Sequence, residues 1–349
     1  MVGCQEIGIA KGALAVEPAS LPVAPLPPLA TRLTVIVVTS PVHCHPSTEL
    51  LDKVVESLGL LPQLDQCRLI VVADGGREAT KYQPKAGKVP AATLAGYEQY
   101  LQALERRVAA AAAGVWSRAE VVRLAERVGF GHAVKRGLEL SDTEYCLVVQ
   151  HDHAFAQPAA ALALPRVLQW MDAHAANYLS LPISTTFRHL NRCFSEYRVD
   201  VRGRAVPVAG ALPGGGTGRT AAAATATAIP VMFWYDSTHL ARREAYLRLV
   251  FAGPKPLPVG RFIEDVFGHR VMARLRDDFD RWAAVYRCWC LAVAPPGRPD
   301  VPLIYHLDGR KYFTDRQRAA MGYSGNPNPV RGQRDAASAE GDAAAPFGV

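Results

Sequence analysis

The sequence predicts an α/β fold in which a mostly parallel central sheet is flanked by helices. Two observations support this class: three continuous apolar segments rich in β-branched residues, and helical patterns between them. The apolar segments are LTVIVVTS (33–40), CRLIVVADGG (67–76) and EYCLVVQHDHAF (144–155). Strands that alternate with helices are joined by right-handed crossovers, which set the strands parallel to one another.

Helical patterns follow each of the first two strands. Ser47 or Thr48 can cap the first helix, which continues in ELLDKVVESL. Its apolar residues recur at helical spacing and are Leu50, Leu51, Val54, Val55 and Leu58. An Ala-rich amphipathic helix is expected over about residues 94–113, and HAVKRGLEL (132–140) predicts a third helix.

Carboxylates follow two of these strands, with Asp74 after the second and Asp152 after the third. In open parallel sheets, ligands bind beyond the carboxyl ends of the strands. The sequence therefore predicts that Asp74 and Asp152 meet at a ligand site on that edge of the sheet.

Composition limits the class of protein. The chain has 349 residues, 49% of them hydrophobic, which is enough to build a core. No uninterrupted apolar run reaches the ~18 residues of a membrane-spanning helix, and the first residues lack a secretory signal pattern. We therefore expect a protein that is cytoplasmic or peripheral to a membrane. The net charge is +7, but the basic residues are scattered, so no nucleic-acid partner is expected.

Three segments are poor in core-forming residues. We expect a flexible Pro/Ala-rich segment over 1–30, a mobile Gly/Ala-rich insertion over 203–228, and a disordered tail over 323–349, leaving one domain over 31–322. The run ALPGGGTGRT inside the insertion is similar to a phosphate loop. Pro213 and Arg219, however, stand where that loop needs Gly and Lys.

Four ordered motifs resemble those of the family 2 glycosyltransferases, over about residues 32–310. The first strand and helix resemble the family's opening unit, and IVVADGG resembles its IIVVDDGS segment. VGFGHAVKRGLELSDTEYCLVVQHDHAF is similar to NLGFARARNRGLELATGEYILFLDDD, which is the most specific match. FIEDVFGHRV resembles the segment that carries the catalytic base. The resemblance implies a GT-A-like, Rossmann-like domain.

This resemblance implies transfer of a sugar from a nucleotide-diphosphate sugar to an acceptor hydroxyl. The reaction would invert the sugar and depend on Mn²⁺ or Mg²⁺. A non-processive enzyme is expected, because Asp278 replaces the Gln of the QxxRW motif of processive synthases and no membrane span is evident. The acceptor is expected to be a glycan, a protein or a small molecule. The residues that the resemblance assigns to the donor are Thr39, Asp74, Gly131, Lys135, Gln150 and Asp152.

The metal motif departs from the family pattern. Aligned on Tyr145, the family's Asp-x-Asp falls on Gln150-His151-Asp152, so Gln150 replaces the first aspartate. Asp152 keeps the position that contacts the cation. His153 and His306 are candidate imidazole ligands, which suit Mn²⁺ better than Mg²⁺.

The same resemblance assigns the catalytic base to Asp265, with Glu264 beside it. These residues lie where a helix is expected to start, and carboxylates also suit that position for electrostatic reasons. The preceding segment, VMFWYDSTHLARREAYL, resembles the family's acceptor border. It contributes four candidates for contact with the acceptor, namely Trp234, Tyr235, Asp236 and His239.

Two other functions stay open. Gln150 is compatible with a catalytically silent relative that binds a nucleotide sugar or a glycan. A sugar-phosphate nucleotidyltransferase shares the general architecture, but it needs a Gly-rich basic loop after the first strand, and PVHCHPST is not one.

Overall fold

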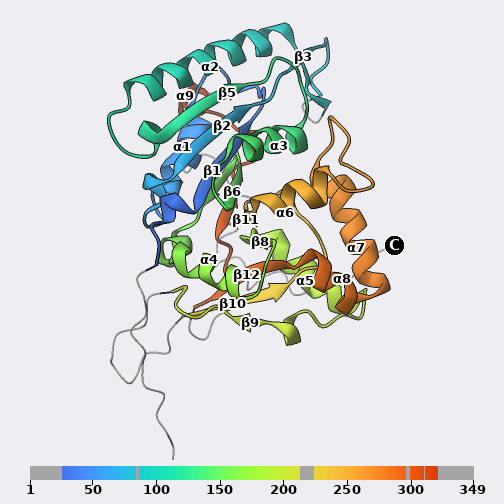
Figure 1. Ribbon diagram of the computed structural model, residues 1–349. Helices are drawn as coiled ribbons and strands as arrows, with labels where there is room; N and C mark the ends of the chain where they lie inside the picture. Colours follow the sequence, from blue (N-terminus) through green and yellow to red (C-terminus); the bar gives the residue numbers. More distant parts are fainter. Residues whose placement is uncertain (1–25, 84–85, 213–223, 296–298, 310, 321–349) are drawn as a thin grey trace, which may run out of the picture.

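A nine-stranded sheet forms the centre of the molecule (Figure 1). The computed structural model describes residues 26–83, 86–212, 224–295, 299–309 and 311–320. The strands of this sheet are β1 (Leu33–Thr39), β2 (Arg68–Ala73), β5 (Ala119–Arg123), β6 (Tyr145–Gln150), β8 (Tyr178–Ser180), β9 (Val206–Pro207), β10 (Thr225–Pro230), β11 (His239–Arg242) and β12 (Cys288–Ala294). Their order is β5-β2-β1-β6-β11-β8-β12-β10-β9. β10 and β11 run against the other seven, so the sheet is mostly parallel.

Helices cover both faces of this sheet (Figure 1). They are α1 (Glu49–Leu58), α2 (Ala91–Ala110), α3 (Phe130–Leu140), α4 (Leu164–Ala173), α5 (Ser184–Ser195), α6 (Arg243–Tyr246), α7 (His269–Asp277), α8 (Phe279–Tyr286) and α9 (Asp315–Ala320). Alternate residues of β1 point to opposite faces of the sheet. Val35 and Val37 belong to the core cluster that includes α1, α2 and α4. Ile36 and Val38 belong to the cluster on the other face, which includes α3, α5 and α7. Burial on both faces explains the continuous apolar runs.

The fold class predicted from the sequence is confirmed, and so are the predicted first, second and third strands and the helices between them. β5, in the stretch before the third helix, is a strand that the sequence analysis did not assign. The third apolar segment is also two strands rather than one. It leaves the main sheet after Gln150 and continues as β7 (His153–Phe155), which pairs antiparallel with β13 (Ile304–His306). A second small sheet joins β3 (Arg77–Glu78) to β4 (Lys88–Val89).

The structure corrects the expectation of mobility for parts of two segments, 1–30 and 203–228. Leu29 is buried in a short helical turn, because it packs against the core beside β1. β9 and the first residues of β10 lie within 203–228 and hydrogen-bond to each other at the edge of the sheet, so part of that segment belongs to the sheet. The remainder, 1–25, 213–223 with the phosphate-loop-like run, and 321–349, lies outside the described residues.

In the part of the chain that the structure describes, no helix is both long and apolar enough to cross a membrane. The longest, α2, has 20 residues but carries several charged side chains.

Candidate active site

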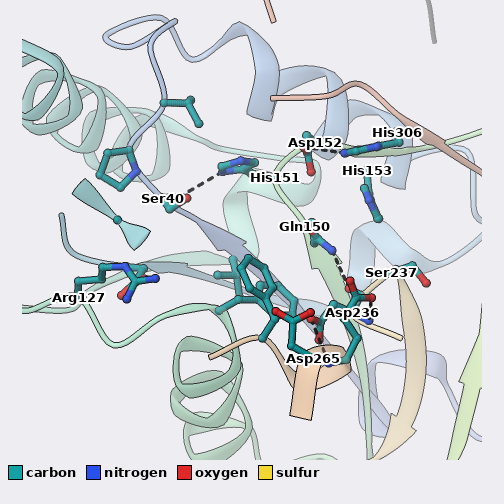
Figure 2. A pocket seen from close by; sticks show the side chains of 18 of the residues that line it. Ser40, Arg127, Gln150, His151, Asp152, His153, Asp236, Ser237, Asp265 and His306 are labelled. Atoms are coloured by element: carbon teal, nitrogen blue, oxygen red, sulfur yellow. Dashed lines mark hydrogen bonds and ion pairs between the residues drawn. The ribbon is translucent and has the colours of Figure 1, made fainter. Parts of the chain in front are cut away.

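A cavity of about 270 Å³ lies at the carboxyl ends of β1, β2 and β6 (Figure 2). Ser40 follows β1, Asp74 follows β2 and Gln150 ends β6, and all three line the cavity. This is the edge at which an open parallel sheet binds ligands. Asp152 and Asp265, which are far apart in the chain, line the same cavity. The structure thus brings together the three aspartates that the sequence analysis singled out.

One end of the cavity is formed by Asp152, His153 and His306 (Figure 2), which we call the Asp-His-His group. Antiparallel pairing of β7 with β13 sets His306 directly opposite His153, although 153 positions separate them in the sequence. His306 Nε2 lies 3.1 Å from Asp152 Oδ2, and one potential ligand atom from each residue lies within 4.8 Å of the others. A two-stranded ladder therefore builds the group.

The two carboxylate oxygens of Asp152 differ in their hydrogen bonds. Asp152 Oδ2 accepts a hydrogen bond from the Gly309 backbone N–H at 2.9 Å, whereas Asp152 Oδ1 is buried without a partner among the described residues. Burial disfavours the charge on Asp152, but the hydrogen bond from His306 and the neighbouring imidazoles outweigh it and hold its pKa below its usual range. Burying an ionised carboxylate with one oxygen that lacks a hydrogen-bond partner is costly. This arrangement is therefore better suited to binding a cation than to a purely structural role.

His153 is held from behind by a hydroxyl. Its Nδ1 lies 3.3 Å from Thr238 Oγ1, which leaves Nε2 for another partner. Burial lowers the pKa of His153 to about 4, so the ring is neutral at physiological pH. A neutral imidazole whose second nitrogen is oriented by a neighbour is the arrangement found at metal ligands.

His151 faces a different partner. The Ser40 backbone N–H donates to His151 Nδ1 at 3.2 Å, so that nitrogen is the acceptor and the ring proton lies on Nε2. Thr39 Oγ1 lies 3.0 Å from the same nitrogen and also contacts the Tyr100 hydroxyl. Thr39, expected at the donor, is thus buried behind the wall and fixes His151.

The other end of the cavity carries Glu264 and Asp265, which open the helical turn leading into α7. Asp265 is exposed, and no partner of its carboxylate is found in the described part of the chain. Behind it, the buried Asp236 carboxylate accepts the backbone N–H groups of Ile263 at 3.2 Å and Glu264 at 3.3 Å. In return the Asp236 N–H donates to Glu264 Oε2 at 3.3 Å.

Asp236 therefore clamps the segment that carries Asp265. Burial and the charge of Glu264 raise the pKa of Asp236 well above its usual value. Gln150 Nε2 donates to the Asp236 carbonyl oxygen at 2.9 Å (Figure 2). Gln150 is thus tied to the Asp236 clamp rather than to the Asp-His-His group.

Asp74 holds a loop across the cavity. Its carboxylate accepts the N–H groups of Val128 at 2.8 Å and Gly129 at 3.0 Å, and burial raises its pKa despite these bonds. Next to this loop lies Arg127, a cavity-lining cation that the sequence analysis missed (Figure 2). A Cβ on Gly129, which has φ +79°, would lie 2.7 Å from Gly260 Cα, so glycine is needed where the two loops meet.

Besides Thr39, five other residues expected at the site lie elsewhere. Gly131 is buried against the 257–263 segment, and Lys135 pairs with a glutamate of its own helix. The side chains of Trp234 and His239 are fully buried in the core, and Tyr235 packs against other aromatic rings beside it. None of the five lines the cavity. Trp234 and Tyr235 do not because the aromatic segment before α6 is used for packing, and Asp236 is the one acceptor-side candidate that lines the cavity.

No family model matches the chain, and no curated protein matches it. Among solved structures, it is similar to the mannosyltransferase PcManGT from Pyrobaculum calidifontis in complex with GDP-Man and Mn²⁺, with 15% identity and a TM-score of 0.41 over 88% of this chain and 69% of that one. It is also similar to S. aureus TarS 1–349, with 16% identity and a TM-score of 0.31 over 62% and 48% of the two chains. The complex of TarS 1–349 with UDP-GlcNAc gives 18% identity and a TM-score of 0.28 over 44% and 34%. This chain covers between 21% and 48% of the TarS chains.

Proposed function

We propose that the protein is a glycosyltransferase that moves a sugar from a nucleotide-diphosphate sugar to an acceptor hydroxyl, with inversion and without processivity. The observation that carries the proposal is that one cavity has the Asp-His-His group at one end and Asp265 at the other, whose carboxylate has no partner among the described residues. Displacement of a diphosphate needs positive charge at the leaving group and a base at the attacking hydroxyl. The two ends are suited to these two tasks.

Asp152, His153 and His306 would hold a divalent cation. The fit rests on the unpartnered Asp152 Oδ1, the neutral ring of His153 and the short distances within the group. A mixed set of one carboxylate and two imidazoles suits Mn²⁺ better than Mg²⁺. When bound, the ion would offset the negative charge of the diphosphate.

The remaining chemistry belongs to the side chains. Asp265 takes the proton of the acceptor hydroxyl on its carboxylate, which is free to do so because no described residue hydrogen-bonds or ion-pairs with it. Arg127 provides a positive charge at the cavity wall for the donor's phosphates. Asp74 acts indirectly: its two backbone hydrogen bonds keep the loop next to Arg127 in place.

The test is transfer from a panel of sugar nucleotides in the presence of Mn²⁺, for the wild type and for Asp265→Asn. Loss of a general base lowers the rate by about 10²- to 10⁴-fold, while binding of the nucleotide diphosphate should not change. Full activity in Asp265→Asn would remove Asp265 from the role of base.

A catalytically silent protein that only binds nucleotide sugar or glycan is the second candidate. It is favoured by Gln150, which replaces a carboxylate and whose amide is used in a bond to Asp236. Thermal stabilisation by a nucleotide diphosphate without turnover of any donor would select this candidate, since a ligand of the native state stabilises it whether or not it reacts.

A further inference from the structure

A second cavity, of about 320 Å³, borders the first. Ser184, Thr185 and Arg188, from the first turns of α5, form one wall, and the segment from Pro302 to His306 forms the other. This volume is enough for a small molecule or for one unit of a larger one.

The two cavities share a wall. Ile183 and His306 line both of them, and His306 belongs to the Asp-His-His group. A molecule seated in the second cavity therefore lies next to the site at which we place the donor diphosphate. A donor and an acceptor must occupy neighbouring positions of this kind for direct transfer.

The two cavities differ in the acidic side chains that line them. Five carboxylate side chains line the first cavity, whereas no acidic side chain is found among the described residues that line the second. Arg188 is exposed to the second cavity, and its guanidinium makes no ion pair within the described residues. Hydroxyl groups of Ser184, Thr185 and Tyr305 add further donors, while Pro302 and Ile304 add an apolar wall.

We propose that the second cavity binds the acceptor through an anionic group, a phosphate or a carboxylate, held by Arg188. The planar guanidinium matches the paired oxygens of either group, and the hydroxyls can complete the contacts. The apolar wall suits the carbon skeleton that joins this group to the attacking hydroxyl. This inference rests on the proposed function, and it adds the class of acceptor.

The experiment compares three acceptors of the same carbon skeleton: glycerol phosphate, glycerate and neutral glycerol. Transfer from the sugar-nucleotide panel is measured with Mn²⁺ for the wild type, Arg188→Gln and Arg192→Gln. Arg192 is the matched control, because it lies one turn further along α5, pairs with Glu196 and does not line the cavity. In parallel, binding of glycerol phosphate and of glycerate without donor is followed by NMR titration.

We expect one anionic acceptor to exceed glycerol in kcat/KM by about tenfold or more, the value of one charge-assisted contact. Arg188→Gln should remove that preference, and Arg192→Gln should keep it. The anion that is preferred identifies the group. Equal use of glycerol, or an unchanged preference in Arg188→Gln, would overturn the inference.

The binding arm separates the two proposals. If no donor is turned over, the proposed function fails. Binding of an anion that Arg188→Gln abolishes would still support the anion site. If the wild type binds neither anion, the acceptor inference fails, even where the donor is used.

Discussion

The two ends of the main cavity hold their carboxylates in different ways. At one end Asp152 is buried and contacts His306 and Gly309, and one of its oxygens has no partner in the part of the chain that the structure describes. At the other end Asp265 is exposed, and the structure fixes instead the backbone behind it, through Asp236. The difference matches the two proposed tasks: a cation ligand must be held at a fixed position, whereas a base must keep its carboxylate free for a proton.

The first and largest expected effect is at the Asp-His-His group. His306→Ala should lower Mn²⁺ affinity by more than the ~10- to 100-fold that loss of an outer partner costs, because an imidazole ligand itself is removed. Mn²⁺ binding is measured by calorimetry on the purified protein. His151→Ala is the matched control, since His151 is held by Ser40 and lies outside the group. Equal losses in the two variants would contradict the assignment.

The second prediction concerns the clamp behind Asp265. Asp236→Asn replaces one accepting oxygen with an N–H donor. Because this donor would face a backbone N–H, the segment that carries Asp265 should shift. We expect kcat to fall by up to about 100-fold, the cost of misplacing a reacting group, with Mn²⁺ affinity unchanged. Stability should drop by about 1–2 kcal/mol, as for a lost cap.

Ser237→Ala is the control for Asp236→Asn. Its hydroxyl is buried next to Asp236 but has no hydrogen-bond partner in the described chain, so its removal should cost little. If Asp236→Asn lowered Mn²⁺ affinity as much as kcat, the two ends would not be independent.

The third prediction tests whether the Thr238 hydroxyl orients the His153 ring of the Asp-His-His group. Thr238→Val keeps the shape of the side chain but removes the hydroxyl that contacts His153 Nδ1. Mn²⁺ affinity should fall by about tenfold, at the low end for an outer partner. Thr238→Ser restores the hydroxyl and should restore affinity; a valine variant that binds Mn²⁺ normally would show that packing alone orients His153.

The smallest effect is expected at Gln150, which connects β6 to the clamp. Gln150→Glu sets a carboxylate against the Asp236 carbonyl oxygen, so a hydrogen bond is replaced by repulsion. We expect a loss of about 1 kcal/mol in the free energy of unfolding, measured by chemical denaturation. Gln150→Met, which removes the bond without adding charge, should lose less. Equal stability of the wild type and the glutamate variant would show that Gln150 contributes nothing to the clamp.

The parallel half of the sheet was predictable because its strands are buried on both faces and read as apolar runs. The same logic located Asp74 and Asp152, since the end of a strand fixes where the next residue lies. Asp265 was found through the resemblance of its motif. All three aspartates could be singled out because the signal for each lies in the residues next to it in the sequence.

The parts that were missed depend on contacts that no local pattern records. Arg127 reaches the cavity because Asp74 holds the adjacent loop, and no spacing in the sequence marks it. The segment around Trp234 was expected at the acceptor, yet aromatic residues pack equally well in a core, and the structure uses them there. β5 was not assigned because its residues are only partly buried and lack a continuous apolar run.

The pairing of β7 with β13 has a consequence for how the protein matures. His306 arrives on the last strand of the described chain, after every strand of the main sheet has been made. During synthesis, a ribosome-bound chain can thus complete its sheet before His306, the third residue of the proposed cation site, has emerged. Cation capture by the proposed site would then report that every strand of the main sheet has been made, and a product terminated before β13 would lack one of the three proposed ligands.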